Sequence, residues 1–266
     1  MTSQRRPPGV GICSVTYRQL TARRLAEQAA RAGLAVIEWG ADVHAPPSEP
    51  AVLSDVAAAT EQYGLRCHSY GSYFRAGVSP ASDLVAIARA ANVLGATRIR
   101  VWAGAVGTAD ASASDRDRVV RGLRHAVEVA DHYGLEVATE FHSGTLADSA
   151  EAVLRLIEAV DRPGLGSYWQ PPVGMPDDEA LQGLAFMADH VVALHVFSWW
   201  PEQERRPLME RGGLWRGAAD VLTQRKRDID WLLEFVPDDD PGALAGEARS
   251  LLSLRPASSS SEAGDQ

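Results

Sequence analysis

The chain has 266 residues, of which 26 are Lys or Arg and 35 are Asp or Glu, so its formal net charge is −9. Hydrophobic residues make up 45% of the chain, which is enough for one sizeable core. An acidic protein repels phosphate backbones, and no basic patch is visible here, so we expect no nucleic-acid partner. The apolar runs are far shorter than a membrane span, and the polar start has no signal segment. We therefore expect a soluble, cytoplasmic protein that binds no membrane.

Amphipathic stretches with helical periodicity end repeatedly at a glycine, and a short apolar run follows each glycine at once. Glycine suits this position because it accepts the left-handed conformation that ends a helix. Along the chain the glycines step by 31, 31, 39 and 30 residues, which is the length of one strand plus one helix. They are Gly33, Gly64, Gly95, Gly134 and Gly164.

The apolar runs show no alternation with polar residues, which is typical of parallel strands covered by helices. Eight strand-helix units fill residues 9–254 and predict an α/β fold, a single-domain (β/α)8 TIM barrel. A doubly wound open sheet is the weaker alternative, because no glycine-rich phosphate-binding loop follows the first strand. Residues 1–8 are then an N-terminal tail, and residues 255–266 are a disordered C-terminal tail. The predicted strands start near Gly9, Ala35, Leu65, Thr97, Leu135, Leu165, Val191 and Ile229.

One helix start has a specific signature. Ser114 followed by Asp117 is the pattern of a capping box, in which each side chain accepts a hydrogen bond from the other residue's backbone N–H. We therefore predict that a helix begins directly after Ser114.

The carboxyl ends of the predicted strands carry the candidate chemistry, because function in such a barrel lies at that face. Four consecutive strands end in an oxygen or nitrogen donor, namely Glu140, Gln170, His195 and Glu234. Two carboxylates, an amide oxygen and an imidazole without a thiolate suit Mn²⁺ best, with Mg²⁺, Co²⁺ or Zn²⁺ as alternatives. Each residue has a plainer reading as an ordinary polar strand end. The four together favour a divalent metal ion, because two glutamates this close need a cation or a proton between them.

The two cysteines, Cys13 and Cys67, are too few for a disulfide framework and lack the spacing of a zinc site. We expect both to be buried thiols.

The segments that contain these residues resemble the xylose isomerase-like barrels, a family usually described as sugar phosphate isomerases/epimerases. The segments are Val36–Trp39, Ala138–His142, Leu194–Val196 and Leu232–Val236, and the resemblance covers about residues 10–254. It implies a divalent metal held by a glutamate on strand five, a carboxylate on strand six, a histidine on strand seven and a glutamate on strand eight. Glu140, His195 and Glu234 match that set, whereas Gln170 stands where the family has a carboxylate. The loss of one negative charge should weaken metal binding.

The resemblance implies proton transfer at a carbon next to a carbonyl, through an enediolate, with Glu140 and Glu234 as base and acid. This is the chemistry of a metal-dependent sugar isomerase or epimerase. The single lysine, Lys226, makes an imine mechanism unpromising. A dehydratase or deglycosidating lyase on a sugar or polyol is a close variant. A non-catalytic sugar-binding barrel that has lost its metal through Gln170 is the alternative from another class.

A metal-dependent endonuclease of the same fold is discounted, because the chain offers neither a basic groove nor the additional metal ligands such an enzyme needs.

Other polar and aromatic residues near the strand ends are candidates for contact with a sugar or polyol. Aromatic rings offer flat walls to the C–H faces of a sugar, and an arginine can hold an anionic group. The competing reading for each is structural: rim packing, a satisfied histidine, or a loop salt bridge. A homo-oligomer is compatible with the sequence. The candidates are Glu38, Trp39, His68, Tyr70, Arg75, Trp102, His142, Trp169 and Arg206.

Overall fold

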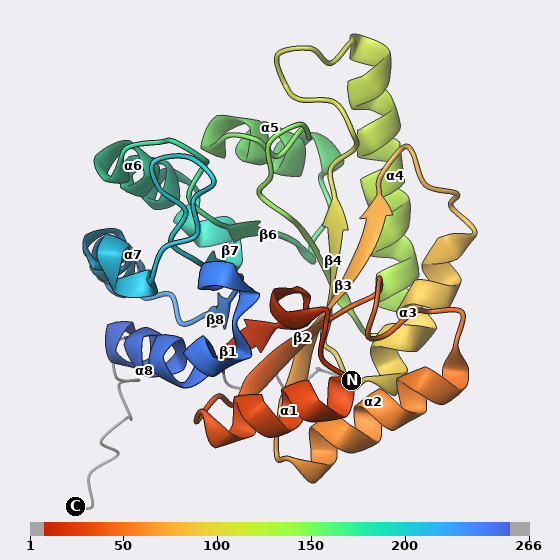
Figure 1. Ribbon diagram of the computed structural model, residues 1–266. Helices are drawn as coiled ribbons and strands as arrows, with labels where there is room; N and C mark the ends of the chain where they lie inside the picture. The colour runs from red at the N-terminus through yellow and green to blue at the C-terminus, as the bar shows by residue number, and fades with distance from the viewer. Residues whose placement is uncertain (1–7, 256–266) are drawn as a thin grey trace, which may run out of the picture.

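Eight parallel strands pair in sequence order, and β1 pairs with β8 to close the barrel (Figure 1). The computed structural model describes residues 8–255, so most of the two expected tails lies outside the described residues. The strands are β1 Val10–Cys13, β2 Val36–Gly40, β3 Arg66–Arg75, β4 Arg98–Trp102, β5 Glu136–Thr139, β6 Leu165–Trp169, β7 Val191–Val196 and β8 Asp230–Leu233. The helices are α1 Ala22–Arg31, α2 Pro50–Gln62, α3 Asp83–Val93, α4 Ala113–His132, α5 Ala150–Val160, α6 Asp177–Met187, α7 Gly212–Gln224 and α8 Leu244–Leu254.

The predicted barrel is confirmed, and each strand begins within one residue of its predicted start. The five glycines that set the repeat all have φ between +69° and +87°, the left-handed region expected where a helix ends. No helix within residues 8–255 is both long enough and apolar enough to cross a membrane.

The capping box at the start of α4 exists, but it lies two residues before the predicted position. Ser112 caps the helix: its hydroxyl accepts from Asp115 N at 3.1 Å, and Asp115 Oδ2 accepts from Ser112 N at 2.9 Å. The spacing rule is satisfied by both Ser-x-x-Asp pairs, and the structure uses the earlier one. The prediction of Ser114 as the cap was therefore wrong.

We expect Ser112→Ala to lower the free energy of unfolding by about 1 kcal/mol, because the first turn of α4 loses its cap. Urea denaturation measures this change. Ser114→Ala is the matched control, since that serine lies inside the helix, and its effect should stay within about 0.5 kcal/mol. Equal effects of the two substitutions would contradict the assigned cap.

Strand residues alternate between two very different environments. The outer face packs apolar side chains against the helices, as expected for a parallel barrel. The inner face carries buried charges, and its apolar part is a small interior cluster. That cluster consists of Cys13, Val15, Val36, Ala138, Tyr168, Ala193 and Leu232. Because the interior is largely polar, its charges must be paired with one another to be tolerated.

Asp230, the first residue of β8, gathers the charges at the bottom of the barrel. Its carboxylate lies 2.8 Å from Arg98 Nη2 and 2.9 Å from His68 Nδ1, and it accepts a hydrogen bond from Gly9 N at 2.9 Å. Burial by itself raises the pKa of Asp230, but His68 and Arg98 outweigh burial and lower the pKa from 3.8 to about 2. The ion pair therefore ties β8 to β4 and to the segment before β1.

This pKa shift gives stability a defined dependence on pH. A carboxylate with a lowered folded-state pKa stabilises the fold above its unfolded value near 3.9, and that contribution is lost as pH falls towards 2. We expect the ionisation of Asp230 to account for a decrease of about 2 kcal/mol in the free energy of unfolding over this pH range. Unfolding free energies of the wild type and Asp230→Asn between pH 5 and pH 2.5 test it. The variant should show a shallower slope, and parallel slopes would contradict the assignment.

Candidate metal and substrate site

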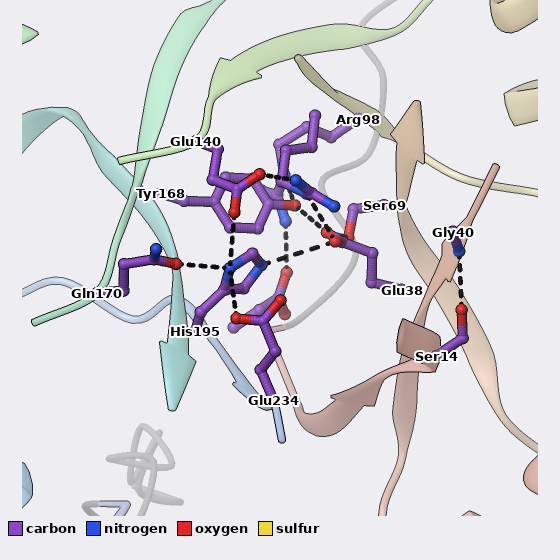
Figure 2. A network of polar contacts seen from close by, with 12 residues as sticks. Ser14, Glu38, Gly40, Ser69, Arg98, Glu140, Tyr168, Gln170, His195 and Glu234 are labelled. Atoms are coloured by element: carbon purple, nitrogen blue, oxygen red, sulfur yellow. Dashed lines mark hydrogen bonds and ion pairs between the residues drawn. The ribbon is translucent and has the colours of Figure 1, made fainter. Parts of the chain in front are cut away.

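His195, near the end of β7, lies at the centre of the predicted donor set (Figure 2). Its Nδ1 atom is 3.0 Å from Gln170 Oε1, 3.4 Å from Glu234 Oε2 and 4.0 Å from Glu140 Oε1. All four residues follow or end neighbouring strands, and the shared strand-end geometry aims them at one point. The structure thus brings the four predicted metal ligands together around one imidazole nitrogen.

Glu38 faces the other nitrogen of the same ring. Its Oε1 atom lies 3.6 Å from His195 Nε2, which has no hydrogen-bond partner among the described residues. The second oxygen of Glu38 accepts hydrogen bonds from Ser69 and Tyr168, each at 2.7 Å. Glu38 therefore lies against the ring nitrogen that points away from the donor set, while Nδ1 faces Gln170, Glu234 and Glu140. Glu38 was predicted to contact substrate, but it instead lies beneath the donor set.

Arg100, on β4, is inserted between two of the carboxylates. Its Nε donates to Glu38 Oε1 at 2.8 Å, and its Nη1 forms an ion pair with Glu140 Oε2. Gly71 makes room for the guanidinium, because a Cβ atom there would lie 2.6 Å from Arg100 Nη2. Burial raises the pKa of Glu38, but the charge of Arg100 and the contact with His195 outweigh it and hold that pKa well below its usual range. Glu38 is therefore ionised at neutral pH.

The residues present fit a divalent cation. Glu38, Glu140 and Glu234 carry three negative charges and Arg100 carries one positive charge, so the group has a net charge of −2. One imidazole nitrogen and oxygens from two carboxylates and an amide form a donor set that Mn²⁺, Mg²⁺, Co²⁺ or Zn²⁺ accepts. Only one oxygen of Glu140 is held by Arg100, which leaves Oε1 facing His195.

A cavity of about 470 Å³ opens above this group. Glu140, Gln170 and Glu234 line it, and the indole rings of Trp102 and Trp199 form part of its wall. The N–H groups of both indoles are buried without a hydrogen-bond partner among residues 8–255. The cavity therefore combines apolar walls with a few polar side chains, namely Glu140, Gln170 and Glu234, which is the usual composition of a small-molecule site.

Two further cavity residues have unusual backbone geometry. Tyr73 and Phe235 line the cavity with φ of 56° and 55°, in the left-handed region that non-glycine residues rarely adopt. Such positions concentrate at binding and catalytic sites, where surrounding contacts hold them. Thr16 holds one of them, since its hydroxyl accepts from Phe235 N at 3.1 Å.

His142 also lines the cavity and belongs to a stack of three side chains. Its ring stacks on Trp102 with the centroids 4.4 Å apart, and the Arg75 guanidinium lies 4.0 Å from the centre of the Trp102 ring. His142 Nδ1 is 2.6 Å from the Ser143 carbonyl oxygen, which can only accept, so Nδ1 is the donor of that hydrogen bond. Trp102 and His142, two of the predicted substrate contacts, thus line the cavity. Arg75 does not line it and instead lies against the Trp102 ring.

The other predicted contact residues lie elsewhere. Because side chains alternate along a strand, Glu38 faces inward and its neighbour Trp39 faces outward, where Nε1 donates to Thr60 on α2 at 2.9 Å. Tyr70 and Trp169 also belong to the outer core. His68 is held by Asp230 at the barrel bottom, and Arg206 is paired with Glu204 in a loop. None of these residues lines the cavity.

No sequence pattern placed Arg100, Arg18 or Cys13 at the site, although the prediction that Cys13 and Cys67 are buried thiols is confirmed. Arg100 shares its strand parity with Trp102, so the alternation that places the tryptophan inward also places the arginine there. Arg18 lines the cavity while its Nε donates to Asp42 at 2.5 Å, and no sequence pattern marks it. The Cys13 Sγ atom lies within 4.8 Å of ligand atoms of His195 and Glu234, and burial, followed by the charges of Glu38 and Glu234, raises the pKa of this thiol.

Comparison with known proteins places these features in context. A 3-dehydroshikimate dehydratase from Bacillus anthracis is 35% identical over 75 residues, which span 28% of this chain and 27% of that protein. The crystal structure of the probable 3-DHS dehydratase AsbF from Bacillus anthracis superposes with a TM-score of 0.73 at 18% identity, covering 91% of this chain and 98% of that chain. D-allulose 3-epimerase from Methylomonas sp. superposes with a TM-score of 0.71 at 14% identity, covering 95% and 99%.

These two structural similarities establish a shared barrel fold. The sequence profile described as "Xylose isomerase-like TIM barrel" matches residues 26–254, which is most of the chain. The chain therefore belongs to the xylose isomerase-like TIM barrel family.

Proposed function

We propose that the protein is a divalent-metal-dependent enzyme that moves a proton at the carbon next to a carbonyl group in a small sugar or polyol-derived substrate. The observation that carries this proposal is the convergence of Gln170, Glu140 and Glu234 on His195 Nδ1 beneath the cavity. A divalent ion held by these residues would polarise the substrate carbonyl and stabilise the negative charge that develops on it. A cavity of about 470 Å³ suits a small molecule.

Isomerisation or epimerisation is the first form of this chemistry. It needs two groups that remove and return the proton, and Glu140 and Glu234 enter the cavity from β5 and β8, on different sides of the barrel. Glu38 and Arg100 hold His195 and Glu140 in place from below. The rings of Trp102 and Trp199, which line the cavity, would cover the C–H face of the substrate.

Dehydration is a second candidate, and a specific observation favours it. Arg100 holds one oxygen of Glu140 in an ion pair, whereas His142 lines the cavity with Nδ1 against the Ser143 carbonyl oxygen, so Nε2 is the ring nitrogen that could take a proton from a substrate. A base there would take the proton next to the carbonyl, and Glu234 would protonate a hydroxyl on the following carbon, which leaves as water. The similarity to a 3-dehydroshikimate dehydratase supports this alternative.

One experiment tests the shared step and separates the two outcomes. The purified protein is analysed for bound divalent metal, and then incubated in D₂O with a panel of ketoses, aldoses and hydroxylated cyclic ketones. We expect about one ion per chain and deuterium entering next to the carbonyl. A changed stereocentre or carbonyl position indicates an isomerase or epimerase, and loss of water with absorbance of a conjugated carbonyl indicates a dehydratase. Binding of a sugar without metal or exchange would overturn the proposal in favour of a non-catalytic barrel.

Gln170 gives a direct test of the metal site. We expect Gln170→Asp to tighten binding of Mn²⁺ at least tenfold, or about 1.4 kcal/mol, because it replaces the neutral amide that faces His195 with a negatively charged ligand. Isothermal titration of the metal-free protein measures this change. Gln203→Asp is the matched control, since Gln203 lines the cavity without contacting His195, and it should tighten binding much less. Unchanged or weaker affinity in Gln170→Asp would show that residue 170 is not a ligand.

A further inference from the structure

A buried thiol lies beside the proposed metal site, at the end of β1. Cys13 is 1% exposed and belongs to the interior cluster. Its Sγ atom, a ring nitrogen of His195 and a carboxylate oxygen of Glu234 all lie within 4.8 Å of one another. Among the described residues 8–255, no other group of three or more His, Cys, Asp or Glu side chains brings its ligand atoms this close together.

The chemistry of these three atoms is that of a metal ligand set. Zn²⁺ binds Cys sulfur at about 2.3 Å, His nitrogen at about 2.0–2.1 Å and carboxylate oxygen at about 2.0–2.2 Å, so two ligands of one tetrahedral ion lie roughly 3.3–3.7 Å apart. Cys13, His195 and Glu234 reach that spacing with movements of roughly 1 Å at most. The His195 ring is fully buried, its Nε2 has no hydrogen-bond partner among residues 8–255, and its Nδ1 lies 3.4 Å from Glu234 Oε2 on the side of the proposed metal.

Cys67 shows what an ordinary buried thiol looks like in this protein. It lies on the outer face of β3, and its Sγ donates to the Ser69 carbonyl oxygen at 3.3 Å. No imidazole or carboxylate accompanies it in a metal-like group among the described residues. The two cysteines thus have similar burial and different chemical surroundings.

We propose that Cys13 is a thiolate ligand of the metal, together with His195 and Glu234, and that it makes the site prefer Zn²⁺ or Co²⁺ over Mn²⁺ and Mg²⁺. Thiolate is a soft ligand that favours Zn²⁺, whereas Mg²⁺ and Mn²⁺ favour sites built from oxygen. This inference rests on the proposed function, which requires a divalent ion at this place, and it specifies the class of ion. It also revises the expectation of Mn²⁺ drawn from a donor set without sulfur.

Cobalt is the probe of choice, because a Co²⁺–thiolate bond gives an intense near-ultraviolet charge-transfer absorption that nitrogen and oxygen ligands lack. Metal-free full-length protein, with thiols reduced, is titrated with Co²⁺ as wild type, Cys13→Ser and the matched control Cys67→Ser. We expect the band in the wild type and in Cys67→Ser, and Co²⁺ binding without the band in Cys13→Ser. Competition should show Zn²⁺ affinity at least about tenfold lower in Cys13→Ser, with Mn²⁺ affinity changed by less than about twofold.

The outcomes distinguish this inference from the proposed function. Stoichiometric Co²⁺ binding by the wild type without the charge-transfer band overturns the role of Cys13 and leaves the metal-dependent mechanism standing. A wild type that binds none of Co²⁺, Zn²⁺ or Mn²⁺ stoichiometrically overturns both. X-ray absorption at the zinc edge of the wild type needs no variant: a sulfur neighbour at about 2.3 Å that persists in Cys67→Ser supports the proposal, and nitrogen and oxygen neighbours alone refute it.

Discussion

Glu234→Gln should reduce the rate of solvent deuterium exchange at the substrate carbon by about 10³-fold or more, at saturating metal. An amide at this position can neither accept nor return the proton, and general acid–base groups typically contribute 10²–10⁴-fold. The same change removes a charged donor 3.4 Å from His195 Nδ1, so metal affinity should also fall. The side chain keeps its size, and the cavity that Glu234 lines keeps its shape.

Separate measurements resolve these two effects. Metal affinity is determined by titration, and exchange is followed by NMR at metal concentrations that saturate the variant. Glu128→Gln is the control, since that glutamate lies exposed on α4, and it should leave both quantities unchanged. Full recovery of exchange in Glu234→Gln at saturating metal would show that Glu234 ligates the metal without transferring the proton.

Arg100→Met should lower the free energy of unfolding at neutral pH by about 3–5 kcal/mol, the usual cost of removing one partner from a buried ion pair. Arg100 is 3% exposed, and its guanidinium pairs with both Glu38 and Glu140. Without it two buried carboxylates lie close together with no counter-charge. Chemical denaturation measures the loss, and Arg118→Met on the exposed face of α4 should cost less than about 1 kcal/mol.

The contribution of these buried carboxylates to stability should change with pH in opposite directions in the wild type and in Arg100→Met. In the wild type the pKa of Glu38 is lowered, so its contribution is present above the unfolded value near 4.3 and is lost as pH falls. In Arg100→Met the buried carboxylates have raised pKa values, so the variant should gain stability relative to the wild type as pH falls and they take up protons. Adding Glu38→Gln to Arg100→Met should recover part of the loss, because one uncompensated charge is gone. A pH-independent difference would contradict this account.

The barrel was predictable from the sequence because its signals are local and repeated. A glycine with positive φ follows the ends of α1, α2, α3 and α4, and Gly164 directly precedes β6 after the left-handed cap of α5 at Asp161; each following strand starts within one residue of its predicted position. Strand order also follows directly, since each βα unit places the next parallel strand beside the last. The one local error, at Ser114, arose because two overlapping Ser-x-x-Asp pairs satisfy the same rule.

The candidate site was predictable only where it depends on strand ends. Glu140, His195 and Glu234 come together because the end of every strand faces the same cavity floor. Side chains alternate along a strand, so of two adjacent residues only one faces the barrel interior. Glu38 faces inward and Trp39 faces the helices, although both were predicted to contact substrate. Inward-facing residues of different strands come close together only when the barrel closes. The spacing of the cysteines in the sequence therefore could not predict that Cys13 lies near His195 and Glu234.

The charge cluster at the bottom of the barrel bears on how the chain can be divided. Asp230, which opens β8, is the counter-charge of the buried Arg98 on β4 and also accepts from Gly9 ahead of β1. Any fragment that stops before β8 leaves that guanidinium inside a half-formed barrel with no carboxylate to neutralise it. The pairing of β1 with β8 therefore also brings in the carboxylate that neutralises Arg98. We expect barrel closure and burial of this ion pair to occur together, in one cooperative folding step.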